Sequence, residues 1–257
     1  MTDQKKIAPA LPSATILMVR DGAPGLEVLM LRRPETMRFA PGALVFPGGK
    51  VDDADCDPDF WFAHSNTQEL PEDYMYRIAA HREMFEEVGL WHLEEADNPT
   101  EKLHGDFKEI VNDHNWSLDI DDMFPFAHWV TPEPLPMRFD TLFYLCPLKG
   151  KQKPYHEGDE AMELQWINPQ QTLADWENDQ VPLMFPTRLT LIKLARAHSV
   201  EEAVELARTS DVVKTMPTLN VVNGERTVTV PIEAGYGVTT ATQRELRVEG
   251  PARKKSD

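Results

Sequence analysis

The chain has 257 residues and a formal net charge of −17, a length that allows one large domain or one domain with substantial additions. The excess of acidic side chains argues against a nucleic-acid or anionic-membrane partner. There is no apolar run near the roughly 18 residues of a membrane span, the N-terminus lacks the apolar core of a signal peptide, and Cys56 and Cys146 are too few for a disulfide framework. These features predict a cytoplasmic protein.

The first predicted elements are two strands joined by a turn. Residues 1–12 are expected to be a flexible lead, and Ala14–Arg20 and Leu26–Arg33 are apolar runs typical of strands. The Asp21-Gly22 pair between them is a hairpin signal. Because Ala-Pro-Gly follows it, we expect a loop longer than two residues.

An arginine-rich loop follows the second strand. Arg32, Arg33 and Arg38 lie next to a Gly/Pro segment that ends in Phe46-Pro47-Gly48-Gly49. The planar fork of arginine suits phosphate oxygens, so the loop is a candidate anion-binding site. Ion pairs with surface carboxylates are the alternative, and spacing alone does not separate the two.

Residues 54–72 are rich in aromatic side chains. Asp57 is placed to cap a short helix that carries Phe60, Trp61 and Phe62. A substrate lid, a contact in a homodimer and a cluster packed on the domain are three alternatives for this segment.

The next predicted helix carries a dense acidic cluster. Pro71 suits its first turn, and the helix should run to about Val88. At helical spacing Glu83, Glu86 and Glu87 fall within one third of the circumference, opposite an apolar face. Like charges so close cost roughly 0.2–0.5 kcal/mol per pair, and a divalent cation with oxygen ligands would turn that repulsion into attraction. A solvated charged face is the alternative. His81 lies on the apolar side and is expected to be a core histidine with its hydrogen bonds satisfied.

The rest of the chain alternates between strands and helices, which predicts an α+β fold. The expected strands are Phe126–Val130, Arg138–Cys146 and Met162–Ile167, with a polar loop at 149–160. The expected helices span 99–115, a short segment from Asn168-Pro169, Thr187–Ala197, and a segment that Ser199 opens with a capping box. A hairpin is expected at Leu219–Val222 and Arg226–Val230 around Asn223-Gly224, and residues 233–257 are expected to be a tail with a disordered end.

The acidic helix also carries a family signature. The run Arg82-Glu83-x-x-Glu86-Glu87-x-Gly89-Leu90, with Gly49 upstream, resembles the signature box of the Nudix hydrolases. The box is enlarged, because 32 residues separate Gly49 from Arg82, and Asp55 stands in place of its first glutamate.

This resemblance implies a Nudix fold, a mixed sheet sandwiched between α-helices, over residues 13–232, with an insertion at 54–72 and added C-terminal helices and hairpin at 187–232. It implies Mg²⁺ or Mn²⁺ as cofactor, bound by Gly49, Glu83, Glu86 and Glu87. Arg82 and Glu86 are the implied catalytic pair, with Arg82 orienting the cluster through an ion pair. Nudix enzymes often supply a base from the loop at 149–160; Glu160 aligns best and Glu157 is second, with an ordinary solvated glutamate as the alternative.

A second resemblance concerns the substrate. Arg33, Arg38 and Gly42 ahead of the box are similar to an extra motif of coenzyme A diphosphatases, although Leu31 and Pro34 replace its Thr and Ser. The enlarged box and the string 136–141 resemble the same branch. The resemblance implies that Arg33, Arg38 and Arg138 contact the substrate; a surface salt bridge is the alternative for Arg138.

The favoured interpretation is a coenzyme A or acyl-coenzyme A diphosphatase that releases 3′,5′-ADP and a 4′-phosphopantetheine product. A Nudix hydrolase for another nucleoside diphosphate derivative, such as ADP-ribose or a dinucleotide, is the second hypothesis. A non-catalytic Nudix-fold binding module is the third. In each case the partner is a small molecule.

Overall fold

Strands β1 (Ala10–Gly22) and β2 (Gly25–Arg32) are buried on both faces, which explains their nearly continuous apolar sequence. Ala14, Ile16 and Met18 point to one hydrophobic core, whereas Leu17 and Val19 point to another. The two cores therefore lie on opposite sides of one sheet. This computed structural model describes residues 7–37, 39–94, 99, 102–155, 162–222, 224–242 and 245–246.

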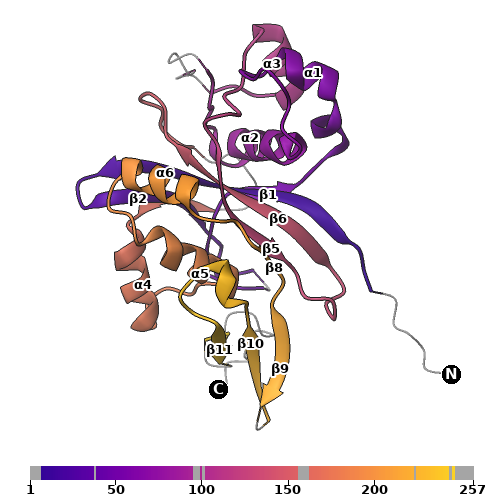
Figure 1. The fold of residues 1–257 in the computed structure, drawn as a ribbon. Helices are drawn as coiled ribbons and strands as arrows, with labels where there is room; N and C mark the ends of the chain where they lie inside the picture. Colours follow the sequence, from indigo (N-terminus) through magenta and orange to yellow (C-terminus); the bar gives the residue numbers. More distant parts are fainter. Residues whose placement is uncertain are drawn as a thin grey trace, which may run out of the picture.

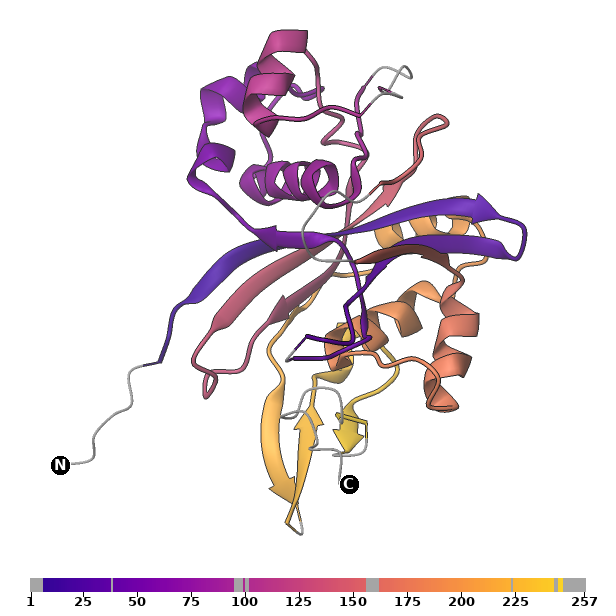
Figure 2. The same ribbon diagram turned by 180° about the vertical axis from the view of Figure 1, so that it is seen from behind.

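Helices cover both faces of the sheet, as the expected α+β fold requires (Figure 1). Helix α2 (Tyr74–Val88) packs on one face, with α1 (Pro58–Ala63) and α3 (Phe107–His114) above it. Helices α4 (Pro169–Glu177), α5 (Phe185–Leu194) and α6 (Val200–Thr209) lie on the other face (Figure 2). Within the described part of the chain, no helix combines the length and the apolar character needed to cross a bilayer.

The main sheet is mixed. Its strands run in the order β3-β2-β1-β6-β5-β8, with β4 paired to β1 and β7 paired to β2. The central pair, β1 and β6, is parallel, and its register runs from Ala10 opposite Arg138 to Val19 opposite Pro147. The bounds of the other strands are β3 (Leu44–Val45), β4 (Gly48–Lys50), β5 (Phe124–Val130), β6 (Arg138–Pro147), β7 (Glu163–Ile167) and β8 (Lys214–Thr215).

The loop of the first hairpin is shorter than expected. Gly22 pairs with Gly25, so the turn contains only Ala23 and Pro24. Gly25 has φ +106°, a backbone conformation that a side chain would strain, and this permits the tight reversal. The prediction of a longer loop was wrong because it counted Asp21, Gly22 and Gly25 as part of the loop, whereas all three pair in the strands.

Two helices begin later than the sequence indicates. Helix α2 starts at Tyr74 rather than in the turn at Pro71, and it ends at Val88, where Gly89 adopts a left-handed conformation with φ +64°. Helix α3 starts at Phe107, because the Asp106 carboxylate accepts the Glu109 N–H at 2.9 Å and so caps the first turn. The expected helix over 99–115 was therefore too long at its N-terminal end.

The aromatic insertion packs against α2. Asp57 caps α1 as predicted, accepting the Phe60 N–H at 3.2 Å. Trp61 is fully buried beside Phe107 and Phe85 in an aromatic cluster formed with α2 and α3. Of the three alternatives for this segment, the structure shows a packed cluster; a 3-10 turn, η1 (Asp53–Cys56), precedes it.

The predicted C-terminal hairpin is confirmed as β9 (Thr218–Val222) and β10 (Glu225–Thr229). The expected tail, however, begins with ordered structure. A 3-10 turn, η2 (Ile232–Ala234), leads to β11 (Thr240–Thr242), which pairs with β10 to make a small three-stranded sheet. The Tyr236 ring between them stacks on Trp129, with ring centroids 5.0 Å apart. Hydrophobic contacts that a sequence pattern does not reveal hold this segment to the domain.

Candidate active site

Helix α2 is covered on two sides and carries its acidic residues on the third. Met84 and Val88 pack on the sheet, and Ile78 and Phe85 face the aromatic cluster. His81 is buried as expected for a core histidine, and its ring bonds to the Asp119 backbone. Its Nε2 atom has no hydrogen-bond partner among the described residues, so the expectation of satisfied hydrogen bonds holds only in part. The side of α2 that faces neither the sheet nor the aromatic cluster carries four charged residues, Arg82, Glu83, Glu86 and Glu87.

Arg82 lies at the centre of this side of α2 and bonds in two directions. Its Nη1 donates to Glu86 at 2.9 Å and to Glu83 at 3.0 Å. Its Nε and Nη2 donate to the two carboxylate oxygens of Asp55 at 3.1 and 3.0 Å, and Nη2 also donates to the Lys50 carbonyl at 2.7 Å. The expected ion pair between Arg82 and Glu86 is present. Asp55, which is fully buried, provides the second anchor of the guanidinium.

The glycine turn brings the backbone against the acidic helix. The Gly48 N–H donates to Glu87 at 2.8 Å, and β4 pairs with β1 so that Gly49 lies opposite Ala14. A Cβ atom on Gly49 would overlap the Glu83 carboxylate, and one on Gly48 would overlap the backbone of β1. Glycine at both positions therefore lets the turn pack closely against Glu83 and against the backbone of β1.

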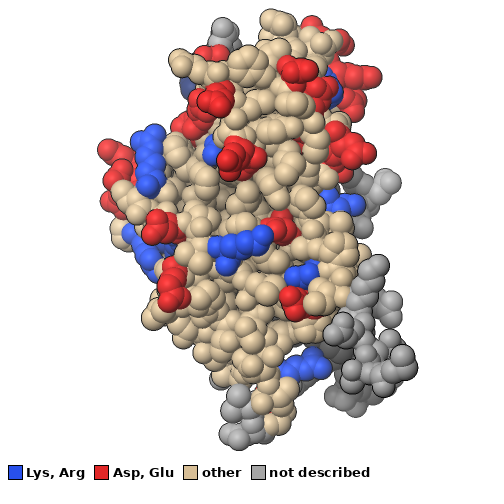
Figure 3. Space-filling view, turned by 45° about the vertical axis from the view of Figure 1, so that its right-hand side comes forward, with Lys and Arg blue, Asp and Glu red and all other residues tan. Residues whose placement is uncertain are grey.

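The site carries more negative than positive charge. Burial raises the pKa of both Glu83 and Glu86, and Arg82 offsets only part of this effect. Figure 3 shows further acidic side chains on the upper part of the molecule, where α1–α3 lie. A cation at this position would therefore be attracted by the local and the surrounding charge.

The donor set fits a hard divalent cation. Carboxylate and carbonyl oxygens are the ligands that Mg²⁺ and Mn²⁺ prefer, and the missing Cβ of Gly49 leaves the space in which Glu83 approaches the backbone. Among the described residues the carboxylates of Glu83, Glu86 and Glu87 do not converge on one point, because Arg82 holds two of them and Gly48 holds the third.

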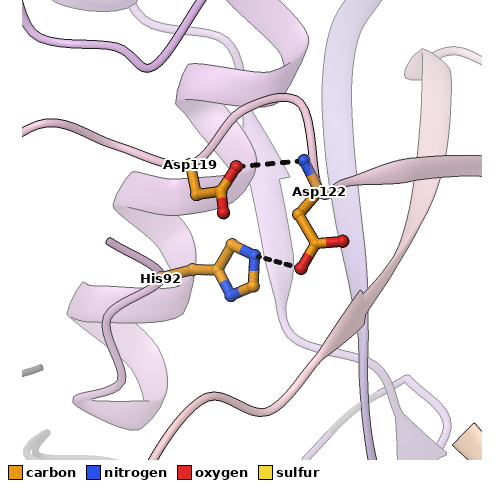
Figure 4. Close-up of side chains that lie close together, drawn as sticks. All are labelled: His92, Asp119 and Asp122. Atoms are coloured by element: carbon orange, nitrogen blue, oxygen red, sulfur yellow. Dashed lines mark hydrogen bonds and ion pairs between the residues drawn. The ribbon is translucent and has the colours of Figure 1, made fainter. Parts of the chain in front are cut away.

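A separate cluster of possible metal ligands lies elsewhere. His92, Asp119 and Asp122 offer ligand atoms within 4.8 Å of one another in the described part of the chain (Figure 4). The His92 Nε2 atom lies 3.6 Å from Asp122, and the ammonium of Lys149 bonds to Asp119 and lies 3.8 Å from Asp122. His92 and Lys149 lower the pKa of Asp122. Since the chain supplies its own cation here, we interpret this cluster as a structural ion network.

The predicted substrate-binding arginines lie in different surroundings. The Arg33 Nε donates to the Phe39 carbonyl at 3.3 Å, within its own loop. Arg138 is almost fully buried and donates to the carbonyls of Ala8 and Thr131 at 2.8 and 3.0 Å. It therefore holds the start of β1 and the end of β5 together, a role that neither expected alternative included. Arg38, Glu157 and Glu160 lie outside the described residues.

Comparisons with known proteins show the family of the chain. The sequence model of the NUDT19 Nudix domain matches residues 62–194. The human protein "Acyl-coenzyme A diphosphatase NUDT19" is 25% identical over 237 residues, which cover 70% of this chain and 63% of that protein. The Caenorhabditis elegans protein "Putative nudix hydrolase 7" is 31% identical over 183 residues, which cover 66% of this chain and 56% of that protein. The chain thus spans roughly 60% of the length of these relatives.

A solved structure shows the same fold. The crystal structure of a NUDIX hydrolase from Alicyclobacillus acidocaldarius superposes with a TM-score of 0.66 at 26% identity, over 78% of this chain and 97% of that one. The mixed sheet with helices on both faces is therefore a Nudix fold, as the signature box implied.

Proposed function

The chain belongs to the Nudix family, and from this we propose that it is a divalent-metal-dependent hydrolase of a phosphoanhydride. The observation that carries the proposal is the Arg82 fork. It holds Glu83 and Glu86 on one side and the buried Asp55 on the other, next to the Glu87–Gly48 contact. An arrangement of this kind, partly buried and with excess negative charge, suits the binding of a cation rather than packing alone.

The residues that would hold Mg²⁺ or Mn²⁺ are the Gly49 carbonyl and the carboxylates of Glu83, Glu86 and Glu87. The chemistry that such a cation supplies is neutralisation of the diphosphate charge and activation of water at neutral pH. Arg82 orients the carboxylates through its hydrogen bonds with Glu83 and Glu86. The helix and the glycine turn fix the position of this set relative to the sheet.

The proposed reaction adds water across one P–O–P bridge. The water oxygen forms a new bond to one phosphorus, the bridging P–O bond breaks, and the bridging oxygen leaves with the other phosphate. One proton of the water must pass to a base, and Glu160 is the proposed base with Glu157 second. Two phosphate monoesters result.

For the substrate we propose coenzyme A or an acyl-coenzyme A, with 3′,5′-ADP and a 4′-phosphopantetheine product. The relative named acyl-coenzyme A diphosphatase and the motif with Arg33 and Arg38 support this choice. Arg33 and Arg38 are the proposed contacts to the substrate phosphates.

A second candidate, another nucleoside diphosphate derivative, is favoured by the departures from that motif. Leu31 and Pro34 stand where the coenzyme A motif has Thr and Ser, and Arg33 bonds within its own loop. A substrate of the ADP-ribose or dinucleotide type would present the same diphosphate to the acidic helix.

A substrate panel tests these proposals. Purified protein with Mg²⁺ or Mn²⁺ is incubated with coenzyme A, an acyl-coenzyme A, ADP-ribose and a dinucleoside polyphosphate, and the products are separated by chromatography. We expect 3′,5′-ADP from the coenzyme A substrates. Rapid cleavage of ADP-ribose without cleavage of coenzyme A would favour the second candidate. Binding without any cleavage would favour a non-catalytic module.

A further inference from the structure

A hydrogen bond joins the aromatic helix of the insertion, α1, to the turn that carries Asp55 into the candidate active site. The indole Nε1 of Trp61 donates to the Ala54 carbonyl at 2.9 Å. Ala54 directly precedes Asp55, which holds the Nε and Nη2 edge of Arg82. The chain of contacts from Trp61 therefore runs through Ala54 and Asp55 to Arg82, which bonds to two carboxylates of α2.

Trp61 is itself held firmly. It is fully buried, and its ring stacks on Phe107 of α3 with centroids 5.7 Å apart. The Lys108 ammonium bonds to Asp57 at 2.7 Å and so ties α3 to the first turn of α1. The indole N–H is thus fixed relative to α2 and α3 rather than to a loosely held loop.

A fixed backbone at Ala54 and Asp55 helps the short Asp55 side chain to reach Arg82. Aspartate is one methylene shorter than the glutamate that the family box usually has, so the Asp55 backbone must lie closer to Arg82 for the carboxylate to reach it. The carboxylate also accepts the Asp52 N–H at 2.8 Å, which folds η1 into a tight turn. The bond from Trp61 holds the Ala54 end of that turn.

We infer that Trp61 is a positioning residue for the cation-binding carboxylates, acting through the Ala54 carbonyl, Asp55 and Arg82. The inference rests on the proposed function, because the affected carboxylates are those of the proposed Mg²⁺ or Mn²⁺ site. When the indole N–H is removed, η1 shifts, the Asp55 carboxylate loosens its hold on one edge of Arg82, and Nη1 no longer aligns Glu83 and Glu86. Residues behind a metal's ligands typically change metal affinity or activity 10–100-fold.

The test compares Trp61→Phe with Trp91→Phe. Trp91 belongs to the same aromatic cluster and is almost fully buried, but its Nε1 has no hydrogen-bond partner among the described residues, so it is a matched control for the loss of an indole. Mn²⁺ binding is measured without substrate by electron paramagnetic resonance, and kcat and KM are measured separately. We expect Trp61→Phe to weaken Mn²⁺ binding about tenfold and to lower kcat more than it changes KM. Trp91→Phe should leave all three near the wild-type values.

A double-mutant cycle with Asp55→Asn separates positioning from general packing. If Trp61 acts through Asp55, Trp61→Phe should weaken Mn²⁺ binding little further in the Asp55→Asn background. Full additivity of the two changes would overturn the inference. If the wild-type protein binds Mn²⁺ and is active, equal Mn²⁺ affinity of Trp61→Phe and Trp91→Phe would also overturn it. A wild-type protein that neither binds Mn²⁺ nor cleaves any substrate of the panel would overturn the proposed function as well. Circular dichroism and the Tm of each variant establish that the comparison is made on folded protein.

Discussion

Glu87 differs from the other acidic residues of α2 because a backbone group holds it. Its carboxylate accepts the Gly48 N–H, whereas Glu83 and Glu86 accept from Arg82. A glutamine at position 87 keeps an oxygen that can accept the same N–H, so a change of charge can be made here without loss of the turn.

We predict that Glu87→Gln lowers kcat by about a hundredfold or more, since even residues behind a metal's ligands alter activity 10–100-fold, while Tm stays near the wild-type value. Steady-state kinetics and thermal unfolding measure the two effects. Glu205→Gln is the control, because Glu205 is an exposed glutamate of α6 and the change in charge is the same. Equal activity of Glu87→Gln and Glu205→Gln would contradict the assignment of Glu87 as a metal ligand.

The raised pKa values of Glu83 and Glu86 predict a pH dependence of metal binding. A carboxyl group must lose its proton to bind a metal, and burial makes these groups hold their protons to a higher pH than the ordinary value of 4.5. As pH falls from about 8, Mn²⁺ affinity should therefore start to weaken above the pH at which an exposed glutamate is protonated. Titration by electron paramagnetic resonance at several pH values measures this, and constant affinity down to about pH 5 would refute it.

At the scale of single elements, α5 carries a buried lysine that packs on β5. Lys193 is only 3% exposed, and its ammonium donates to the Phe126 carbonyl at 2.8 Å. Burial lowers its pKa from 10.5 to about 8, with a smaller effect of Arg196. The charged form is thus less favourable in the folded protein than in the unfolded chain.

This predicts that folding stability rises with pH between about 8 and 10.5, where the unfolded chain binds more protons at this site than the folded protein. Relative to Lys193→Met, the wild-type protein should gain up to roughly 3 kcal/mol of stability over that range. Urea unfolding of both proteins at several pH values measures the difference in their free energies of unfolding. Taking this difference cancels the contributions of other titratable groups. The exposed Lys151→Met serves as control and should show no such trend.

The stack of Tyr236 on Trp129 predicts that the C-terminal sheet contributes to the stability of the whole domain. Tyr236 is 3% exposed, so Tyr236→Ala should lower the free energy of unfolding by about 3 kcal/mol or more, as for other large aromatic residues in cores. Chemical denaturation measures the loss. A change below about 1 kcal/mol would indicate that the segment is only loosely attached.

Elements decided by local sequence were predictable. Asp57, Asn168 and Ser199 cap the helices that follow them, and Gly89 ends α2, because each effect involves residues a few positions apart. The mixed sheet with helices on both faces followed from the family resemblance.

Contacts that depend on tertiary packing were not predictable. The bond from Trp61 to Ala54 depends on how the insertion packs against α3, and the pairing of β11 with β10 depends on hydrophobic contacts of Tyr236. The ion network of Asp119, Asp122 and Lys149 joins segments without any spacing signal. For the same reason, the sequence could place Arg138 on a strand but not show that its guanidinium faces backbone carbonyls.

At the scale of the whole molecule, the two cores share one sheet. Side chains of β1 and β2 alternate between them, so that neither layer of helices can separate without exposing apolar strand residues. Both layers should therefore unfold together.

We predict a single cooperative transition in urea, with the same midpoint for tryptophan fluorescence and for far-ultraviolet circular dichroism. Trp61 and Trp91 report on the aromatic cluster above α2, and Trp129 reports on the core beneath the sheet. One variant keeps Trp129 and lacks Trp61 and Trp91, and a second keeps Trp61 and Trp91 and lacks Trp129. In each variant, the urea midpoint from fluorescence should equal the midpoint from circular dichroism. Separate midpoints would show that the two layers unfold independently.

The parallel pairing of β1 with β6 has a consequence for folding of the protein during its synthesis on the ribosome. β1 is synthesised before its partner, which ends only at Pro147, so the centre of the sheet cannot close until the segment through Pro147 has been synthesised. Until then β1 and β2 exist as a hairpin with two apolar faces, and α2 has no complete sheet on which to pack. Closure of such a long loop is slow compared with local helix formation. The nascent chain therefore presents an aggregation-prone hairpin for the time that translation of the insertion and α3 requires, and this interval is when it would depend on a chaperone.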